Sequence, residues 1–143
     1  MEYTYVEDST CTSCTGTTYT RDATWTADSG VSNTFTDLTV TFPNGLSLNG
    51  LYGSANIVLG SSSETNVPLG VITSYGLSSS IVSWEYDSQV NGWLGLGNNR
   101  ATNLISVMAS GTGFSLEAFQ INIDTDLGHT AIFGYCDSEL AFT

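Results

Sequence analysis

The side chains of this chain that are best suited to catalysis, redox chemistry or metal binding are its three cysteines and its single histidine. Cys11 and Cys14 flank Thr12-Ser13, whereas His129 and Cys136 lie close to the other end of the sequence. Two cysteines at this spacing suit a redox pair, half of a zinc site or a short disulfide. No βαβ pattern surrounds them, and nothing in the sequence brings the four residues together. We therefore expect a Cys11–Cys14 disulfide, with Cys136 free or paired outside the chain.

His129 is the only side chain of a type that titrates near neutral pH, so it is the natural candidate for a general base. It lies between Gly128 and Thr130, where we expect a turn. A serine hydrolase would also need a Gly-x-Ser-x-Gly elbow, and the sequence contains none. We therefore expect a surface histidine and assign no catalytic residue.

Asn122, Asp124 and Asp126 place oxygen atoms at every second residue, with Gly128 after them. This spacing invites comparison with a calcium loop, but an EF-hand needs its glycine one position earlier and a glutamate that is absent here. The same alternation is typical of a half-buried strand with a solvated face. We favour the strand and expect no metal.

The segment Asn91-Gly92-Trp93-Leu94-Gly95-Leu96-Gly97 has three glycines among bulky apolar residues. A dinucleotide-binding loop would read G-x-G-x-x-G between a strand and a helix of a βαβ unit. Here the glycines follow the order G-x-x-G-x-G without such a unit. The favoured interpretation is a strand in which glycine lets another backbone come close, so we expect no cofactor.

Composition predicts a mostly β protein and excludes two classes of partner. Only 11% of the 143 residues are charged, and Ser, Thr, Asn and Gly supply most of the polar surface. The net charge of −12 arises from 14 acidic residues against Arg21 and Arg100. Because nucleic acids and anionic membranes attract cations, we expect neither as a partner. The length suits a single domain over residues 1–143.

The first residues carry no targeting signal. Met1 is followed by Glu2-Tyr3-Thr4-Tyr5, which has neither a basic flank nor an apolar core, so we expect no signal peptide in this chain. A cytosolic chain and a mature or truncated piece of a longer one both fit this observation. The predicted disulfide and the low charge favour an extracellular or secreted protein.

Alternating apolar and polar residues place the strands. Asn44-Gly45 lies between two alternating runs, which predicts a β-hairpin over residues 37–51 with its tip at Pro43-Asn44-Gly45. Further strands are predicted over residues 56–59, 67–72, 81–84, 119–123 and 130–133. Apolar residues at helical spacing predict one short helix over residues 102–108, with Thr102 as its cap and Gly111 beyond its end.

Taken in order, several blocks resemble the N-terminal lobe of the pepsin-like aspartic proteases. The cysteine loop is followed by Gly16-Thr17-Thr18-Tyr19 and Thr24-Trp25, as in that family's segment after its own cysteine loop. The remaining blocks are Leu38–Gly50, similar to the flap hairpin, Asn56–Gly60 and Pro68–Thr73, similar to the next two strands, Asn91–Gly97, similar to Asp-Gly-Ile-Leu-Gly-Leu-Gly, and Ile132–Asp137, similar to Phe-Gly-Gly-x-Asp.

The resemblance implies an all-β fold of one protease lobe, with twisted, partly barrel-like sheets, a flap hairpin and one short helix. It implies flap or ligand-binding roles for Phe42, Pro43, Asn44 and Gly45. It also implies a scaffold element that packs beneath the catalytic loop, formed by Asn91, Gly92, Trp93, Leu94 and Gly95.

The departures from the family concern its chemistry. The family uses two Asp-Thr-Gly loops, one per lobe, whose carboxylates share a proton and activate water. No Asp-Thr-Gly occurs here; Tyr3–Val6 resembles the segment just after the first loop, and Asp28-Ser29-Gly30 comes too late in the order of blocks. Phe42 stands where the family has a flap tyrosine, and Asn91 where it has an aspartate. A homodimer that uses Asp28 from each chain is a third, less favoured idea.

Two hypotheses of function follow. In the first, the chain is a catalytically incompetent module of the aspartic endopeptidase type, a fragment or a pseudoenzyme, that binds an extended peptide or a second lobe. In the second, it is an extracellular structural protein that self-associates through exposed strand edges.

Overall fold

A computed structural model describes residues 3–14, 17–28, 37–43, 45–76, 92–97, 99–111, 114, 117–124 and 128–133. Most elements are strands, and the described residues contain one short helix, which confirms the expected mostly β character. No helix in the described ranges is long and apolar enough to cross a membrane.

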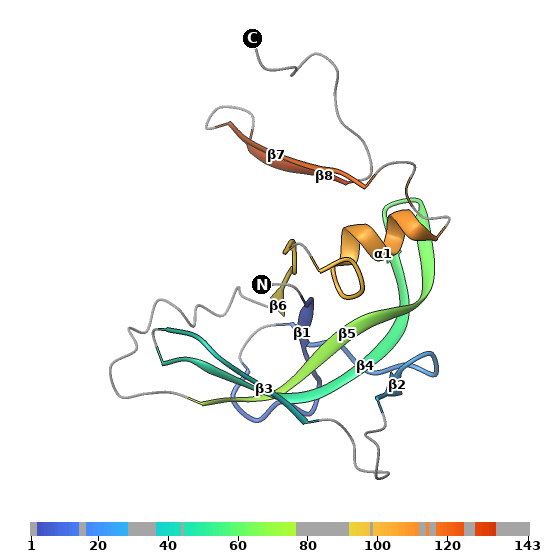
Figure 1. Cartoon of the computed structure of the whole chain (residues 1–143). Helices are drawn as coiled ribbons and strands as arrows, with labels where there is room; N and C mark the ends of the chain where they lie inside the picture. Colours follow the sequence, from blue (N-terminus) through green and yellow to red (C-terminus); the bar gives the residue numbers. More distant parts are fainter. Residues whose placement is uncertain are drawn as a thin grey trace.

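The main sheet is mixed and does not close into a barrel among the described strands (Figure 1). Its path runs β2-β4-β5-β1-β6, and β3 pairs with β4 beside that path. The only parallel pair described in this sheet is β1 with β5. The strands are β1 (Tyr5–Glu7), β2 (Thr26–Ala27), β3 (Asp37–Thr41), β4 (Ser47–Leu59), β5 (Ser62–Gly76) and β6 (Gly92–Trp93).

The β3–β4 hairpin confirms the prediction over residues 37–51, because Asp37 pairs with Leu51 and Thr41 with Ser47. Its turn is closed by two hydrogen bonds, from the Gly45 N–H to the Phe42 carbonyl (2.9 Å) and from the Phe42 N–H to the Leu46 carbonyl (2.8 Å). Gly45 has a φ of +89°, which a side chain would disfavour. This is the three-residue hairpin loop in which a glycine follows the turn as a bulge.

β4 and β5 form one long antiparallel hairpin of 13 and 15 residues. The predicted strands 56–59 and 67–72 are therefore parts of this longer unit, which turns at Gly60-Ser61. Two register shifts interrupt the pairing, and Asn66, at the second, has a φ of +55°. Such bulges bend a strand and increase its twist. β4 and β5 are curved (Figure 1), and the two ends of their hairpin contribute to two different clusters of buried apolar residues.

Apolar residues gather at both ends of the long hairpin. At one end, Tyr5, Leu38, Leu46, Leu48 and Ile72 are buried together. At the other, Val67 packs against Leu104 and Met108 of the helix α1 (Leu104–Ser110).

The helix lies within the predicted region, but its cap differs from the prediction. Asn103, not Thr102, caps α1 by accepting hydrogen bonds from the Ile105 and Ser106 N–H groups. Asparagine in an extended conformation is a strong N-cap because its side chain satisfies free amide groups of the first turn. Gly111 follows the helix as expected.

A separate two-stranded sheet is formed by β7 (Phe119–Asp124) and β8 (Gly128–Phe133). Both strands were predicted, but His129 lies in β8 opposite Ile123 rather than in a turn, which corrects that expectation. The strand β8 already begins at Gly128, where the glycine had suggested a turn. The predicted strand 81–84 lies outside the described residues.

Candidate functional site

A connected group of aromatic and polar side chains lies between the β3–β4 turn and β1. Phe42 at the turn stacks on Trp93 of β6, with ring centroids 6.4 Å apart. Trp93 in turn meets the edge of Tyr75 on β5 at 5.8 Å. All three rings are half-buried and pack against the buried cluster around Leu48. They form an aromatic row from the hairpin turn to the middle of the sheet.

The row ends at a buried carboxylate. The Tyr75 hydroxyl donates a 2.6 Å hydrogen bond to Oε1 of Glu7, whose side chain is only 3% exposed. Among the described residues, no group donates a hydrogen bond to the other oxygen, Oε2. Glu7 is therefore held on one side only. We call the set Phe42, Trp93, Tyr75 and Glu7 the hairpin site.

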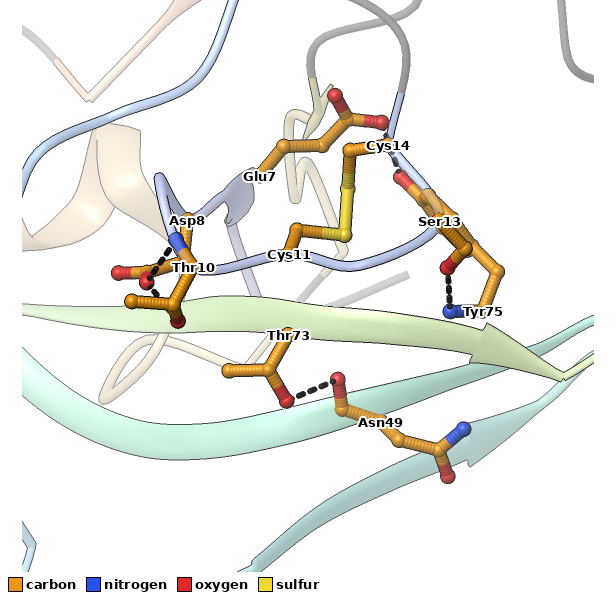
Figure 2. Close-up of a disulfide and its surroundings, with 9 residues drawn as sticks. All are labelled: Glu7, Asp8, Thr10, Cys11, Ser13, Cys14, Asn49, Thr73 and Tyr75. Atoms are coloured by element: carbon orange, nitrogen blue, oxygen red, sulfur yellow. Dashed lines mark hydrogen bonds between the residues drawn. A yellow bond between two sulfur atoms is a disulfide. The ribbon is translucent and has the colours of Figure 1, made fainter.

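The cysteine loop supports this site from the side of β5. Cys11 and Cys14 form the predicted disulfide, with an S–S distance of 2.01 Å. The Thr12 N–H donates to the Thr73 carbonyl (3.2 Å), and the Tyr75 N–H donates to Oγ of Ser13 (2.8 Å). Figure 2 shows the loop along the strand that carries Thr73 and Tyr75. The disulfide loop thus covers an edge of β5 where β1 has ended and fixes the backbone at Tyr75.

Asp8, next to Glu7, is fully buried, and its charge is balanced by an ion pair. Its carboxylate lies 2.7 Å from Nε of Arg21 and accepts hydrogen bonds from the backbone and hydroxyl of Thr10 at 2.9 and 2.5 Å. The backbone of Tyr19 forms an isolated parallel β-bridge with that of Asp8. An ion pair of this kind holds two segments together because loss of either partner leaves a buried charge alone. We assign Asp8 a structural role.

The glycine-rich segment is a backbone framework, in agreement with the strand interpretation. Gly92 pairs with Val6, and a Cβ at Gly92 would collide with the Tyr5 carbonyl. The Gly95 N–H donates to Oγ1 of Thr4 (3.2 Å), and Gly97 accepts from the side-chain amide of Asn103. The segment therefore ties β1 to the start of α1. Leu94 in this segment is 41% exposed.

Several predicted residues take no described part in the hairpin site. Asn44, Asn91, Asp126 and Cys136 lie outside the described residues. Asp28, the rival catalytic candidate, is exposed directly after β2, and its N–H donates to the Tyr52 carbonyl at 2.9 Å. The described ranges contain no group of three or more His, Cys, Asp or Glu residues that could hold a metal ion.

Three tyrosines in mutual ring contact lie at the margin of the buried cluster, to which Tyr5 itself belongs. Tyr3, Tyr5 and Tyr52 form mutual ring contacts, with Tyr3 and Tyr52 at 4.9 Å. Burial, together with the charges of Asp28 and Tyr52, raises the pKa of Tyr3 from 10.0 to about 12. Burial and a hydrogen bond with Tyr52 raise the pKa of Tyr5 even further. Tyr3 and Tyr5 are thus neutral at ordinary pH.

An open hollow of about 330 Å³ lies beside α1. Its polar lining contains Arg100 and Glu117, whose charged groups are 3.2 Å apart, and Ser106 donates to the same Glu117 at 2.6 Å. Arg100 is 81% exposed. The polar groups of this hollow satisfy one another, so they single out no ligand.

The sequence resemblance gave Phe42 a flap role and Trp93 a place in the scaffold element, and it gave no role to Glu7 or Tyr75. Glu7 lies two residues after Tyr5 in a strand and therefore on the same, buried face. This spacing was an available signal for a buried acid. The pairing with Tyr75 had no sequence signal, since it depends on the parallel register of β1 and β5.

Comparison with known proteins adds no family assignment. No family model matches the chain, and no curated protein is significantly similar to it.

Proposed function

We propose that the chain is a non-hydrolytic module of the pepsin-like type that binds an extended peptide at the β3–β4 hairpin. The observation that carries this proposal is the hairpin site itself. A glycine-shaped turn carries Phe42 onto Trp93, so the turn rests on the sheet through one half-buried aromatic contact. A peptide side chain that packs against Phe42 would extend this aromatic contact.

The outer edge of β3 is a second observation in favour of an extended peptide as the ligand. Within the described part of the chain, β3 pairs with β4 alone, and its Thr39 and Thr41 are exposed. An unpaired strand edge offers main-chain donors and acceptors to a peptide in strand conformation. The peptide would thereby reach Phe42 along the strand.

The proposal excludes hydrolysis because the sequence contains no Asp-Thr-Gly triplet. The family's reaction needs two carboxylates that share a proton. The nearest buried acids of the described region do not meet this need, because Asp8 is neutralised by Arg21 and Glu7 is bound by Tyr75. An extracellular location belongs to the same proposal and is supported by the disulfide.

The test is to measure peptide binding and hydrolysis with the same protein. Fluorescence anisotropy with a labelled, neutral peptide of Thr, Val and Ala should report saturable binding. Phe42→Ala should weaken it, whereas Val58→Ala, a matched apolar truncation at a 72% exposed position, should leave it unchanged. Incubation with a denatured protein in acid should give no cleavage. Pepstatin-sensitive turnover, or equal binding by both variants, would contradict the proposal.

A second candidate function is self-association in an extracellular fibre or surface layer. The exposed side chains of Phe119 (43%) and Ile121 (54%) on β7 favour it, because apolar strand surfaces invite pairing. Sedimentation at high concentration separates the two functions. A monodisperse monomer would count against assembly, while concentration-dependent growth of large particles would favour it.

A further inference from the structure

The two adjacent buried carboxylates of β1 and its extension differ in how their charges are balanced. Asp8 has a guanidinium at 2.7 Å and two hydrogen bonds from Thr10. Among the described residues, Glu7 accepts one hydrogen bond, from a neutral phenol, and its Oε2 has no donor. A buried carboxylate without a cation is costly, and such groups are normally paired. Glu7 therefore calls for a positive partner.

The chain has no lysine or arginine left to provide that partner. It contains two such residues in total. Arg21 is engaged by Asp8, and Arg100 lies beside Glu117 at 3.2 Å. A cation from outside the chain fits the arrangement, and the net charge of −12 would concentrate cationic ligands around the protein.

The surroundings of Glu7 suit a particular cation. Tyr75, Trp93 and Phe42 form the aromatic row that leads from the hairpin turn to the carboxylate. Aromatic faces attract ammonium and guanidinium groups, and they also accept the apolar stem of lysine or arginine. A row of aromatic rings that ends in a carboxylate has the chemistry to recognise a basic side chain.

We propose that Glu7 is a specificity-determining residue that receives the lysine or arginine side chain of the bound peptide. The inference rests on the proposed peptide binding and names its preferred ligand. The basic group donates to Oε2, while Tyr75 keeps Oε1 in place. The aromatic row, Phe42 included, covers the apolar stem of that side chain.

The test uses the full chain and a set of labelled peptides. A neutral peptide of Thr, Val and Ala is compared with versions that carry one lysine at successive positions, and with the same versions carrying Nε-acetyl-lysine. Lysine at one position should bind about tenfold more tightly, or better, than its acetylated form, as expected for a hydrogen bond to a charged group. Because acetylation alters the peptide only, this comparison does not depend on the folding of any variant.

Two variants then locate the effect. Glu7→Gln should abolish the preference for lysine over acetyl-lysine, so that both peptides bind equally. Glu117→Gln removes the same charge beside α1 and should retain the preference. A preference that survives Glu7→Gln, that is equal at all peptide positions, or that is absent would overturn the inference and leave the proposed function standing. If the neutral and the lysine peptides both fail to bind, the proposed function falls, and this inference falls with it.

Discussion

The two hairpins β3–β4 and β7–β8 have similar sequence patterns but different surroundings. Leu38 and Leu48 of the first are 1% and 0% exposed, whereas Phe119 and Ile121 of the second are 43% and 54% exposed. The difference arises beyond the hairpins themselves, because β4 continues into a long pairing with β5, while β7 and β8 form a sheet of their own. Alternation thus specifies a strand, but tertiary neighbours decide whether its apolar face is covered.

The largest effect on stability should come from truncating a buried side chain of the β3–β4 hairpin. Leu48→Ala removes a fully buried side chain and should lower the free energy of unfolding by about 2–5 kcal/mol. Ile121→Ala, the matched truncation in β7, should cost less than about 1 kcal/mol because its side chain is already half in water. Urea unfolding of both variants measures the difference, and equal losses would break the comparison.

The disulfide should contribute next. Replacing both cysteines, Cys11→Ser with Cys14→Ser, should destabilise the protein by about 2 kcal/mol, since the loop that it closes is short. Hydrogen exchange should then accelerate at the amides of Thr12 and Tyr75, which donate to the Thr73 carbonyl and to Oγ of Ser13, and not in β7. A wild-type protein reduced with a dithiol serves as the control and should behave as the double variant does.

A smaller effect is expected from the hydroxyl of Tyr75. Tyr75→Phe keeps the ring against Trp93 but removes the hydrogen bond to Glu7, leaving a buried carboxylate without its donor. The free energy of unfolding should fall by about 1–2 kcal/mol. Combining this change with Glu7→Gln should cost less than the sum of the two single changes, because both act on one interaction. Strictly additive losses in the free energy of unfolding would show that Tyr75 and Glu7 do not interact.

Alkaline pH should destabilise the protein through Tyr3, which packs against the buried cluster of the β3–β4 hairpin. The pKa of Tyr3 is raised from 10.0 to about 12, so its contribution to stability is complete below pH 10. Between these values the unfolded chain loses the proton first, and stability therefore falls as the pH rises through 12. Unfolding measured alongside tyrosinate absorbance should show the two changes together. Ionisation of all tyrosines near pH 10 without loss of structure would contradict this.

Local sequence signals gave most of the strands, and their reach explains both successes and errors. The β3–β4 hairpin was predictable because Asn44-Gly45 and the flanking alternation act within a few residues. The continuous β4–β5 hairpin was not, because Ser61-Ser62-Ser63-Glu64-Thr65 is polar throughout and has no alternation. Asn103 was overlooked as a helix cap because Thr102 competes with it in sequence.

The site depended on longer distances. Phe42 and Trp93 were predicted to matter through a family resemblance, but their direct contact follows from the packing of the β3–β4 turn on β6. Glu7 and Tyr75 meet only because β1 and β5 pair in parallel, with Glu7 opposite Ile72. A single sequence does not encode such a register in any local pattern.

Peptide-dependent hydrogen exchange tests the central claim, which is that the β3–β4 hairpin is a peptide-binding element. The full chain would be measured with and without a saturating peptide that carries a single lysine. The account predicts slower amide exchange in residues 37–51 and at β1, with no change in residues 119–133. Protection confined to residues 119–133, or no protection anywhere, would contradict it.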